Sequence, residues 1–261
     1  MFSLIGKRAI VCGATRGIGR ATAEMLAKQG ATITLLARDA GLLAGVAVML
    51  DTSSGQRHDW LAADFSEPEG LAQRLHEFTA AGHYADILVN NTGGPAPGAI
   101  LEAKEAQFLA AFKMHVLCNQ ALVQALTPGM KQRKFGRIIN IISTSVRQPI
   151  PNLGVSNTTR AAVAGWAKTL AGELAPFGIT VNNVLPGYTS TERLHALIDF
   201  RAKQANKDSP TIAAAMEADI PMRRFAAPEE IAAAITFLAS PAASYITGVS
   251  LPVDGGRISA I

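Results

Sequence analysis

The sequence predicts a single-domain α/β fold over residues 1–261, built on a doubly wound parallel sheet of seven strands. Short apolar runs alternate with helical patterns along the whole chain, which is the order of elements that produces such a sheet. The 261 residues are 49% hydrophobic and 17% charged, a length and composition suited to one well-buried domain. A glycine-rich segment, residues 13–19 (Gly-Ala-Thr-Arg-Gly-Ile-Gly), joins the first apolar run to the first helical pattern.

This glycine-rich segment has the character of a phosphate cradle. Residues 9–12 before it form an uninterrupted apolar run typical of a buried strand, and Ile18, Ala21 and Met25 recur at helical spacing after it. Glycines let a backbone turn tightly and approach a pyrophosphate with no Cβ in the way. The helix start adds free N–H groups and a positive dipole end. We therefore interpret residues 13–19 as a dinucleotide-binding loop.

The remaining strands repeat the pattern of the first. They are expected at residues 32–37, 58–62, 85–89, 137–142, 179–184 and 249–253, with helices between them. Asp39 is placed to cap the helix after the second strand. Right-handed crossovers would put helices on both faces of the sheet. Residues 190–222 interrupt the alternation beyond a strand end, where ligands bind in such sheets, so we expect a substrate lid there.

Composition argues against membrane and disulfide-rich classes. No run approaches 18 apolar residues, and the segment before Lys7 is too short for a signal core, so we expect a cytoplasmic protein with no membrane partner. Cys12 lies in a predicted strand and Cys118 in a helical pattern. With no disulfide framework and no metal-ligand spacing, both are expected to be small core residues.

A net charge of +4 and a pI near 9.2 raise the question of nucleic acid binding. The basic cluster Lys131, Arg133, Lys134 and Arg137 follows a long helical pattern that ends near Met130. Cations at that place complement the carbonyl end of a helix. We therefore expect a structural role for the cluster and no nucleic acid partner.

Five motifs in order along the chain resemble the short-chain dehydrogenase/reductase family. They are residues 12–19, where Cys12 replaces the family's Thr; Asp64; Asn90-Asn91-Thr92-Gly93, where Thr92 replaces Ala; Pro186-Gly187-Tyr188 with Thr191; and Val253-Asp254-Gly255-Gly256. Overall, the chain is most similar to the 3-oxoacyl-acyl-carrier-protein reductase-like branch. The resemblance implies a Rossmann fold, a homotetramer, and hydride transfer between a nicotinamide cofactor and a carbonyl or alcohol substrate.

The resemblance also implies a set of cofactor-binding residues. They are Gly13, Thr15, Arg16, Gly17, Ile18, Gly19, Arg38, Asp64, Phe65, Asn91, Gly93, Arg160, Pro186, Gly187, Thr189 and Thr191. An NAD site has an acidic residue at the end of the second strand, whereas this chain has Ala37-Arg38. Arg38, with Arg16 as the opposite jaw, suits a 2′-phosphate, so we expect NADP(H).

The catalytic positions depart from the family pattern. The family has a Ser after the fifth strand, an Asn before it, and a Tyr followed four residues later by a Lys. Here Ser143 is retained, whereas Ser156, Arg160 and His115 stand for Tyr, Lys and Asn. Ser156 and Arg160 share a helix face, and Arg160 can still donate to ribose hydroxyls. A serine is a far weaker acid than a phenol and is shorter, and arginine cannot relay a proton. Ser143 can still polarise a carbonyl.

Two residues are candidate replacements for the missing acid. His115 titrates near neutral pH in water, although a histidine bonded to a backbone carbonyl is the competing interpretation. Tyr188 follows the Pro-Gly segment at the cofactor's edge, although it can equally be a packing wall. The other histidines show no ligand spacing, so no metal site is expected; they are His58, His76, His83 and His195.

Three functions are compatible with these residues. The first is an NADPH-dependent oxidoreductase with a rearranged acid, and the second is a cofactor-binding sensor or partner subunit with little turnover. The third is a hydrolase, because residues 154–158 (Gly-Val-Ser-Asn-Thr) begin like a nucleophile elbow, but the final glycine is missing and no strand directly precedes them. We favour the first, since a cofactor cradle and a lid suggest hydride chemistry.

Small residues in the segment 154–176 indicate a helix that approaches another helix closely. They are Ala161, Ala162, Ala164, Gly165, Ala167 and Ala171. The family resemblance implies a two-fold contact at this helix and the one before it, with a further contact at the C-terminal strand. Packing on the sheet is the alternative explanation for part of this face.

Overall fold

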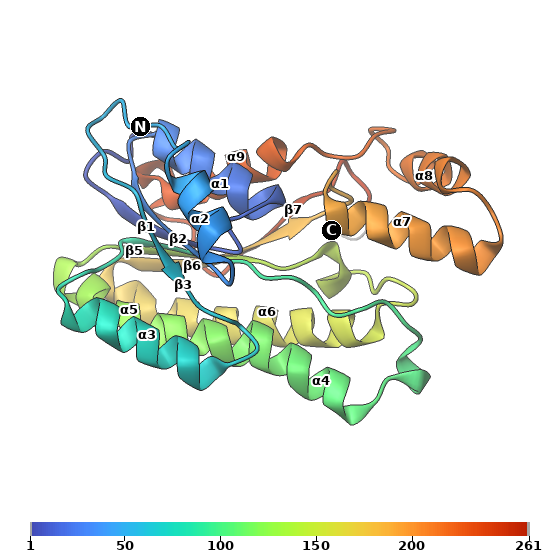
Figure 1. The fold of residues 1–261 in the computed structure, drawn as a ribbon, viewed down its shortest axis with the longest axis horizontal. Coiled ribbons are helices and arrows are strands. Elements are labelled where there is room, and N and C mark those ends of the chain that lie inside the picture. The colour runs from blue at the N-terminus through green and yellow to red at the C-terminus, as the bar shows by residue number, and fades with distance from the viewer. Residues whose placement is uncertain (1, 260–261) are drawn as a thin grey trace.

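The computed structural model describes residues 2–259 and contains one sheet of seven parallel strands (Figure 1). The strands are β1 (Arg8–Cys12), β2 (Thr32–Ala37), β3 (Asp59–Ala62), β4 (Ile87–Asn90), β5 (Gly136–Ile141), β6 (Ile179–Pro186) and β7 (Ser250–Val253). Their order is β3-β2-β1-β4-β5-β6-β7, and every neighbouring pair is parallel. The predicted doubly wound sheet is confirmed, because the chain winds outward from β1 in one direction and from β4 in the other.

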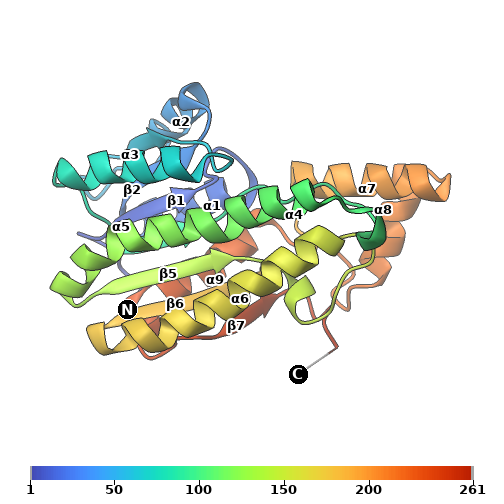
Figure 2. The same ribbon diagram turned by 90° about the horizontal axis from the view of Figure 1, so that it is seen from below.

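Helices cover both faces of the sheet. α1 (Gly17–Lys28), α2 (Ala40–Ala47) and α9 (Pro228–Ala239) lie on one face, whereas α3 (Pro68–Ala80), α4 (Glu105–Phe112), α5 (Cys118–Arg133) and α6 (Gly154–Leu174) lie on the other (Figures 1 and 2). α7 (Glu192–Ala205) and α8 (Ser209–Ala218) project beyond the carboxyl ends of the strands. Two buried clusters, one on each face, form the core.

The sequence explains the burial of the central strands. All six residues of β5 and all four of β4 are buried, as expected for strands that helices cover on both faces. Polar caps fix the starts of the outer helices. Asp39 accepts from the Leu42 N–H at 2.9 Å, which confirms its predicted role as the cap of α2.

A row of buried asparagine side chains crosses the middle of the sheet. The Asn90 amide donates to Asn140 at 2.8 Å, Asn140 donates to Asn183 at 3.0 Å, and Asn183 donates to Ser250 at 3.1 Å. These residues are direct partners in the register of β4, β5, β6 and β7. A slip of one residue would turn the amides to opposite faces, so the row fixes the register of four strands.

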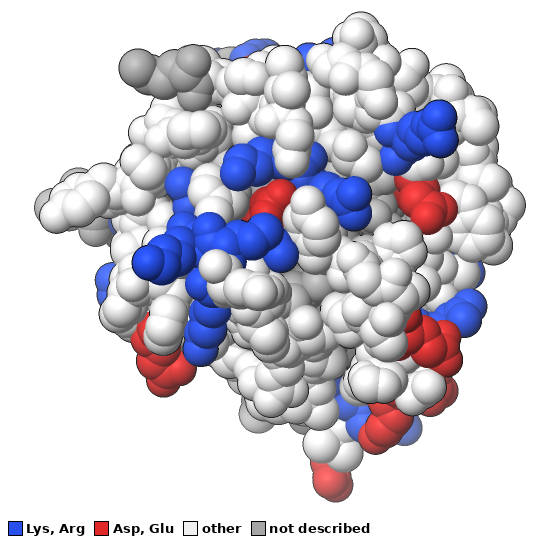
Figure 3. Space-filling view, turned by 90° about the vertical axis from the view of Figure 1, so that its left-hand side faces the viewer, with Lys and Arg blue, Asp and Glu red and all other residues white. Residues whose placement is uncertain are grey.

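The basic cluster lies at the amino ends of the strands, where Figure 3 shows Lys and Arg gathered around an acidic group. Arg133 pairs with Asp86 at 3.0 Å, and Arg137 is buried and donates to the Gly136 carbonyl. Lys131 lies 4.5 Å from the centre of the Phe177 ring. These contacts give Lys131, Arg133 and Arg137 structural roles, and Lys134 is exposed at the end of α5.

Both cysteines are buried and free, as expected. Burial raises the pKa of each thiol, and that of Cys118 reaches about 12. Between residues 2 and 259, no helix is both long enough and apolar enough to cross a membrane.

We predict that Asn140→Ala destabilises the fold strongly, because it leaves the Asn90 amide and the Asn183 carbonyl oxygen buried without partners. The free energy of unfolding should fall by about 3 kcal/mol in urea titrations. Gln132→Ala removes an exposed amide from α5 and should change stability by less than about 0.5 kcal/mol. Equal stability of the two variants would refute the role given to the asparagine row.

Candidate functional site

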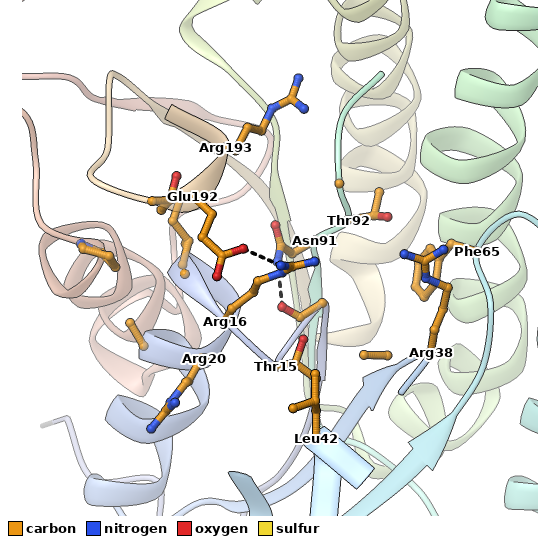
Figure 4. A pocket seen from close by; sticks show the side chains of 18 of the residues that line it. Thr15, Arg16, Arg20, Arg38, Leu42, Phe65, Asn91, Thr92, Glu192 and Arg193 are labelled. Atoms are coloured by element: carbon orange, nitrogen blue, oxygen red, sulfur yellow. Dashed lines mark hydrogen bonds and ion pairs between the residues drawn. The ribbon is translucent and has the colours of Figure 1, made fainter. Parts of the chain in front are cut away.

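A cavity of about 1130 Å³ opens at the carboxyl ends of β1, β2 and β4, beside the glycine-rich loop (Figure 4). Most of the predicted cofactor residues line it, namely Gly13, Thr15, Arg16, Gly17, Ile18, Arg38, Asp64, Phe65, Asn91, Gly93 and Thr191. The crevice at the carboxyl end, where the strand order reverses between β1 and β4, is the place where ligands bind in doubly wound sheets.

The glycine loop is held against the end of β4 at a distance that no side chain allows. Gly13 has a φ of +59°, and a Cβ there would lie 2.7 Å from Nδ2 of Asn91. A Cβ on Gly19 would lie 2.2 Å from the Gly13 carbonyl oxygen. The Asn91 amide donates to the Cys12 carbonyl at 3.2 Å and so ties the loop to β4. Gly19 therefore allows the loop to fold closely onto itself, although it does not line the cavity.

Charged groups mark the end of β2. Arg38, Asp39 and Asp64 all line the cavity, and the carboxylate of Asp39 also caps α2 by accepting from the Leu42 N–H. The pKa of Asp64 lies below its usual value, chiefly because the Ser66 N–H donates to the carboxylate and in smaller part because of the nearby Arg38 charge. Arg38 is exposed and has no carboxylate within ion-pair distance in residues 2–259.

The first turn of α7 contacts two walls of the cavity. Glu192 forms an ion pair with Arg16 of the glycine loop, and Figure 4 shows the two side chains pointing toward one another. Arg193 donates to the carbonyls of Gly94 at 2.9 Å and Pro95 at 3.1 Å. Arg193 was not anticipated from the sequence. The one sequence feature that pointed to Arg193 is a positive charge in the first turn of a helix, where the helix dipole disfavours positive charge.

The predicted catalytic residues of α6 are buried behind this cavity. Ser156 and Arg160 are each 8% exposed, and neither they nor Ser143 line it. Arg160 donates to the Ile141 carbonyl at the end of β5 at 2.7 Å, and its Nε has no partner. Burial and the charge of Arg193 lower the pKa of Arg160 to about 10, so it stays a cation at neutral pH. The predicted ribose contact of Arg160 stays a prediction.

Ser143 follows β5 and caps the short turn Thr144–Val146, where its hydroxyl accepts from the Ser145 N–H at 3.0 Å. Residues 142–153 separate β5 from α6, so Ser156 sits in a first helical turn. A nucleophile elbow needs a strand that turns directly into the helix, and that geometry is missing here.

His115 lies in a π-helical turn, Lys113–Leu117, between α4 and α5. It is 3% exposed, and its Nε2 has no hydrogen-bond partner. Burial, followed by the charges of Arg160 and Arg193, lowers its pKa to about 2, although a hydrogen bond with the Gly93 backbone acts in the opposite direction. The imidazole is therefore neutral throughout the physiological range.

Tyr188 points to a different cavity from the one that the glycine loop lines. It is 8% exposed, and its hydroxyl accepts from Arg201 and Arg257, each at 3.2 Å. The ring of Phe225 contacts it edge-on, with centroids 6.2 Å apart. Its proposed part in proton donation stays a prediction.

The Pro-Gly segment at the end of β6 packs closely against the end of β7 and the residue that follows it. The Gly187 N–H donates to the Val253 carbonyl at 2.9 Å, and a Cβ on Gly187 would lie 2.7 Å from the Asp254 Cα. Thr189 is buried and donates to the Gly187 carbonyl at 3.2 Å. Pro186, Gly187 and Thr189 do not line the cavity, and their predicted cofactor contacts stay predictions.

We predict that His115 makes the fold sensitive to acid. Its pKa is about 2 when folded and near 6.5 for an unperturbed histidine, so between these values the unfolded chain binds one more proton. The contribution of His115 to the free energy of unfolding is complete above about pH 6.5 and falls by about 1.4 kcal/mol for each pH unit below that value. When the pH is lowered from about 7 to about 5, the free energy of unfolding in urea should therefore fall by about 2 kcal/mol less for His115→Asn than for the unmodified protein.

Equal losses in the two proteins would contradict this account. If His115→Asn does not fold, an NMR titration of the unmodified protein answers the same question, because the His115 ring signals should not shift between about pH 8 and about pH 5.

Comparisons with known proteins agree with this geometry. A family model described as "Enoyl-(Acyl carrier protein) reductase" matches residues 13–257. A 3-oxoacyl-[acyl-carrier-protein] reductase, FabG, of Vibrio harveyi is 35% identical over 256 residues, 97% of this chain and 98% of the relative. An NADPH-dependent reductase, BacG, of Bacillus subtilis is 31% identical over 98% of this chain and 99% of its own.

Among solved structures, the L-sorbose reductase of Gluconobacter frateurii, in complex with NADPH and L-sorbose, superposes with a TM-score of 0.92. The two sequences are 33% identical, and the match covers 100% of this chain and 99% of that one. From these likenesses, together with the sheet order and the glycine cradle, the chain belongs to the short-chain dehydrogenase/reductase family, in its 3-oxoacyl-acyl-carrier-protein reductase-like branch.

Proposed function

We propose that this protein is an NADP(H)-dependent oxidoreductase that interconverts a carbonyl and an alcohol without the family's Tyr-Lys pair. The observation that carries the proposal is the cavity between the glycine loop and α7, which has the family's cofactor-binding residues on its walls. Relatives described as NADPH-dependent or solved with NADPH support the choice of cofactor.

The residues present fit a dinucleotide phosphate. Gly13 and Gly19 leave room for a close approach of the backbone, and the first turn of α1 has no acidic residue. Arg38 has no carboxylate partner in residues 2–259, so it is available to a 2′-phosphate. Arg16 can join it once Glu192 releases its guanidinium.

When bound, NADPH supplies the hydride, and the chain must stabilise the charge that the carbonyl oxygen gains. The Ser143 hydroxyl can donate to that oxygen. Arg160 is a buried cation without a carboxylate partner in the described residues, and Arg193 lies close enough to perturb its pKa. Two such cations lower the energy of an alkoxide. We propose that water, not a side chain, delivers the final proton.

Residues 190–222 are proposed to act as the substrate lid. Leu194, Ile198 and Met216 form a small apolar cluster with Tyr188 that is separate from the two sheet cores. This region can thus shift as a unit without opening the sheet. The ion pair between Arg16 and Glu192 joins this region to the glycine loop, and it must open before Arg16 can reach the 2′-phosphate.

A second candidate is an NADP(H)-binding protein with little turnover. Two observations favour it. His115 is neutral in the physiological range, and the Tyr188 hydroxyl already accepts from two arginines. Tyr188 also faces the second cavity and does not line the cofactor cavity, so the cradle would serve a sensor or a partner subunit in this case.

A homotetramer is the proposed assembly. α4 and the π-helical turn that follows it expose Leu109, Phe112 and Leu117, beside the small residues of α6. Exposed apolar side chains on neighbouring helices are suited to pack against a second copy. At the edge of the sheet near β7, Tyr245 and Val249 are also exposed.

We predict that NADPH binds at least about tenfold more tightly than NADH, because Arg38 pairs with the 2′-phosphate. Arg38→Asp should reverse the order by repelling the phosphate and accepting from the ribose hydroxyl. Cofactor fluorescence titrations check both statements. Arg57→Asp, on an exposed residue outside the cavity, is the matched control and should leave the preference intact. Equal affinity for both cofactors in the unmodified protein would disprove the prediction.

We predict normal NADPH binding but slow reduction of simple ketones and 3-oxoacyl substrates. A general acid contributes about a hundred- to ten-thousand-fold, or about 3–5 kcal/mol of barrier, and Ser156 cannot act as one. Ser156→Tyr combined with Arg160→Lys should raise turnover, as followed by NADPH absorbance. Ala72→Tyr with His76→Lys places the same side chains, at the same spacing, on an exposed face of α3 and should not.

Reduction by the unmodified protein at ordinary family rates would contradict this prediction. Tyr188→Phe and His115→Ala would then show which side chain supplies the acid. Full activity in both variants would remove these two residues from the catalytic site.

We predict a tetramer in sedimentation velocity at micromolar concentration. Phe112→Glu should dissociate it, because the charge would be buried against a second copy without a partner. Val48→Glu changes another exposed apolar residue, at the end of α2, and should leave the assembly unchanged. A stable monomer of the unmodified protein would rule the tetramer out.

A further inference from the structure

A second cavity, of about 470 Å³, has Tyr188 on its wall. Its walls come from the loop before α6, from Tyr188 after β6, from α7 and α8, and from the segment after β7. The residues are Ile150, Pro151, Asn152, Tyr188, Arg201, Gln204, Ala205, Ile212, Asp219 and Arg257. None of these belongs to the set assigned to the cofactor.

Two guanidinium groups meet on one neutral oxygen in this cavity. Arg201 Nη1 and Arg257 Nη2 both donate to the Tyr188 hydroxyl at 3.2 Å. The Arg257 guanidinium also lies 4.4 Å from the centre of the Tyr188 ring, and its Nε is buried without a partner. Tyr188 therefore holds the two cations side by side.

The charge of this pair is not balanced by the surrounding residues. Within residues 2–259, neither Arg201 nor Arg257 lies within 4.0 Å of a carboxylate oxygen. Asp219 is the one acidic residue on the cavity wall, which leaves the described lining with an excess positive charge. The carboxylate of Asp254 accepts from the N–H groups of Gly256 and Ile258, so it is engaged elsewhere.

Half-buried guanidinium groups held together in this way are suited to an anion. Bringing two like charges together is unfavourable unless a negative group joins them. A carboxylate can accept from both arginines in a bidentate arrangement, which a neutral hydroxyl cannot match. The two guanidinium groups thus indicate both that a ligand binds in this cavity and that this ligand is an anion.

The two cavities are lined by neighbouring residues of the same segments. Asn152 lines one and Leu153 lines the other, and Ser156 follows in the same helical start. Tyr188 is the residue after Gly187, at the end of β6. A ligand in the second cavity therefore lies beside the cofactor cavity, on the side of the catalytic positions and the proposed lid.

We propose that Arg201 and Arg257 bind the carboxylate of the substrate, and that the substrate class is oxo acids and their hydroxy acid counterparts. The assignment of a substrate class rests on the proposed function. The binding of a carboxylate does not, because it depends only on the two arginines and on Tyr188, which positions them.

The test measures binding without turnover. Acetoacetate, 4-oxopentanoate and longer oxo acids are titrated calorimetrically into the protein saturated with NADP⁺, each beside its neutral amide. The acid of best-fitting length should bind at least about tenfold more tightly than its amide. Arg201→Gln and Arg257→Gln should each weaken the acid by about tenfold or more and leave the amide unchanged.

Lys203→Gln is the matched control, because it removes the same charge from an exposed position of α7 outside the cavity. Equal affinity for every acid and its amide would overturn the proposal. An acid affinity that survives in both arginine variants would overturn it as well.

The NADP⁺ titration that precedes each experiment tests the proposed function separately. A protein that binds no NADP⁺ contradicts the proposed function. The same oxo acid titrations without cofactor then still decide whether the arginine pair binds a carboxylate.

Discussion

The site depends on one contact, between the glycine loop after β1 and the side chain of Asn91 after β4. The Asn91 amide donates to the Cys12 carbonyl, and a Cβ on Gly13 or on Gly19 would collide with the groups around it. This approach fixes where α1 begins relative to the β1–β4 crevice. The ion pair between Arg16 and Glu192 then joins this loop to the start of α7. The cofactor cradle is thus a consequence of backbone packing, with few side chains of its own.

An excess of positive charge is the second organising feature. Three groups of arginines lack carboxylate partners in residues 2–259: Arg38 at the end of β2, Arg160 at one of the predicted catalytic positions, and the pair Arg201 and Arg257. Elsewhere, Arg133 and Arg224 have acidic partners. Arg38 lines the first cavity and Arg201 and Arg257 line the second, so their charge lies where an anionic cofactor and substrate would bring the balancing charge.

The fold could be predicted from sequence because its signals are local. Most strands are short apolar runs, and the glycine loop is continuous, so the doubly wound sheet and the cradle follow from pattern and family resemblance. The site was less predictable, because its details depend on contacts between distant segments. The pKa of His115 is set by burial and by Arg160 and Arg193. The direction of Tyr188 is set by Arg201 and Arg257, one of them far along the chain. Spacing alone does not encode such contacts.

The substitutions at the catalytic positions form a consistent set. An Arg at position 160 keeps a charge where the family has Lys, but its guanidinium turns to the Ile141 carbonyl. A neutral imidazole then suits His115, because protonation would place a further charge beside Arg160 and Arg193. With a serine at position 156, no phenol needs a lysine to lower its pKa. In the proposed function, these changes together remove the proton relay and keep the positive field of Arg160 and Arg193, which would stabilise an alkoxide more than it would assist proton transfer.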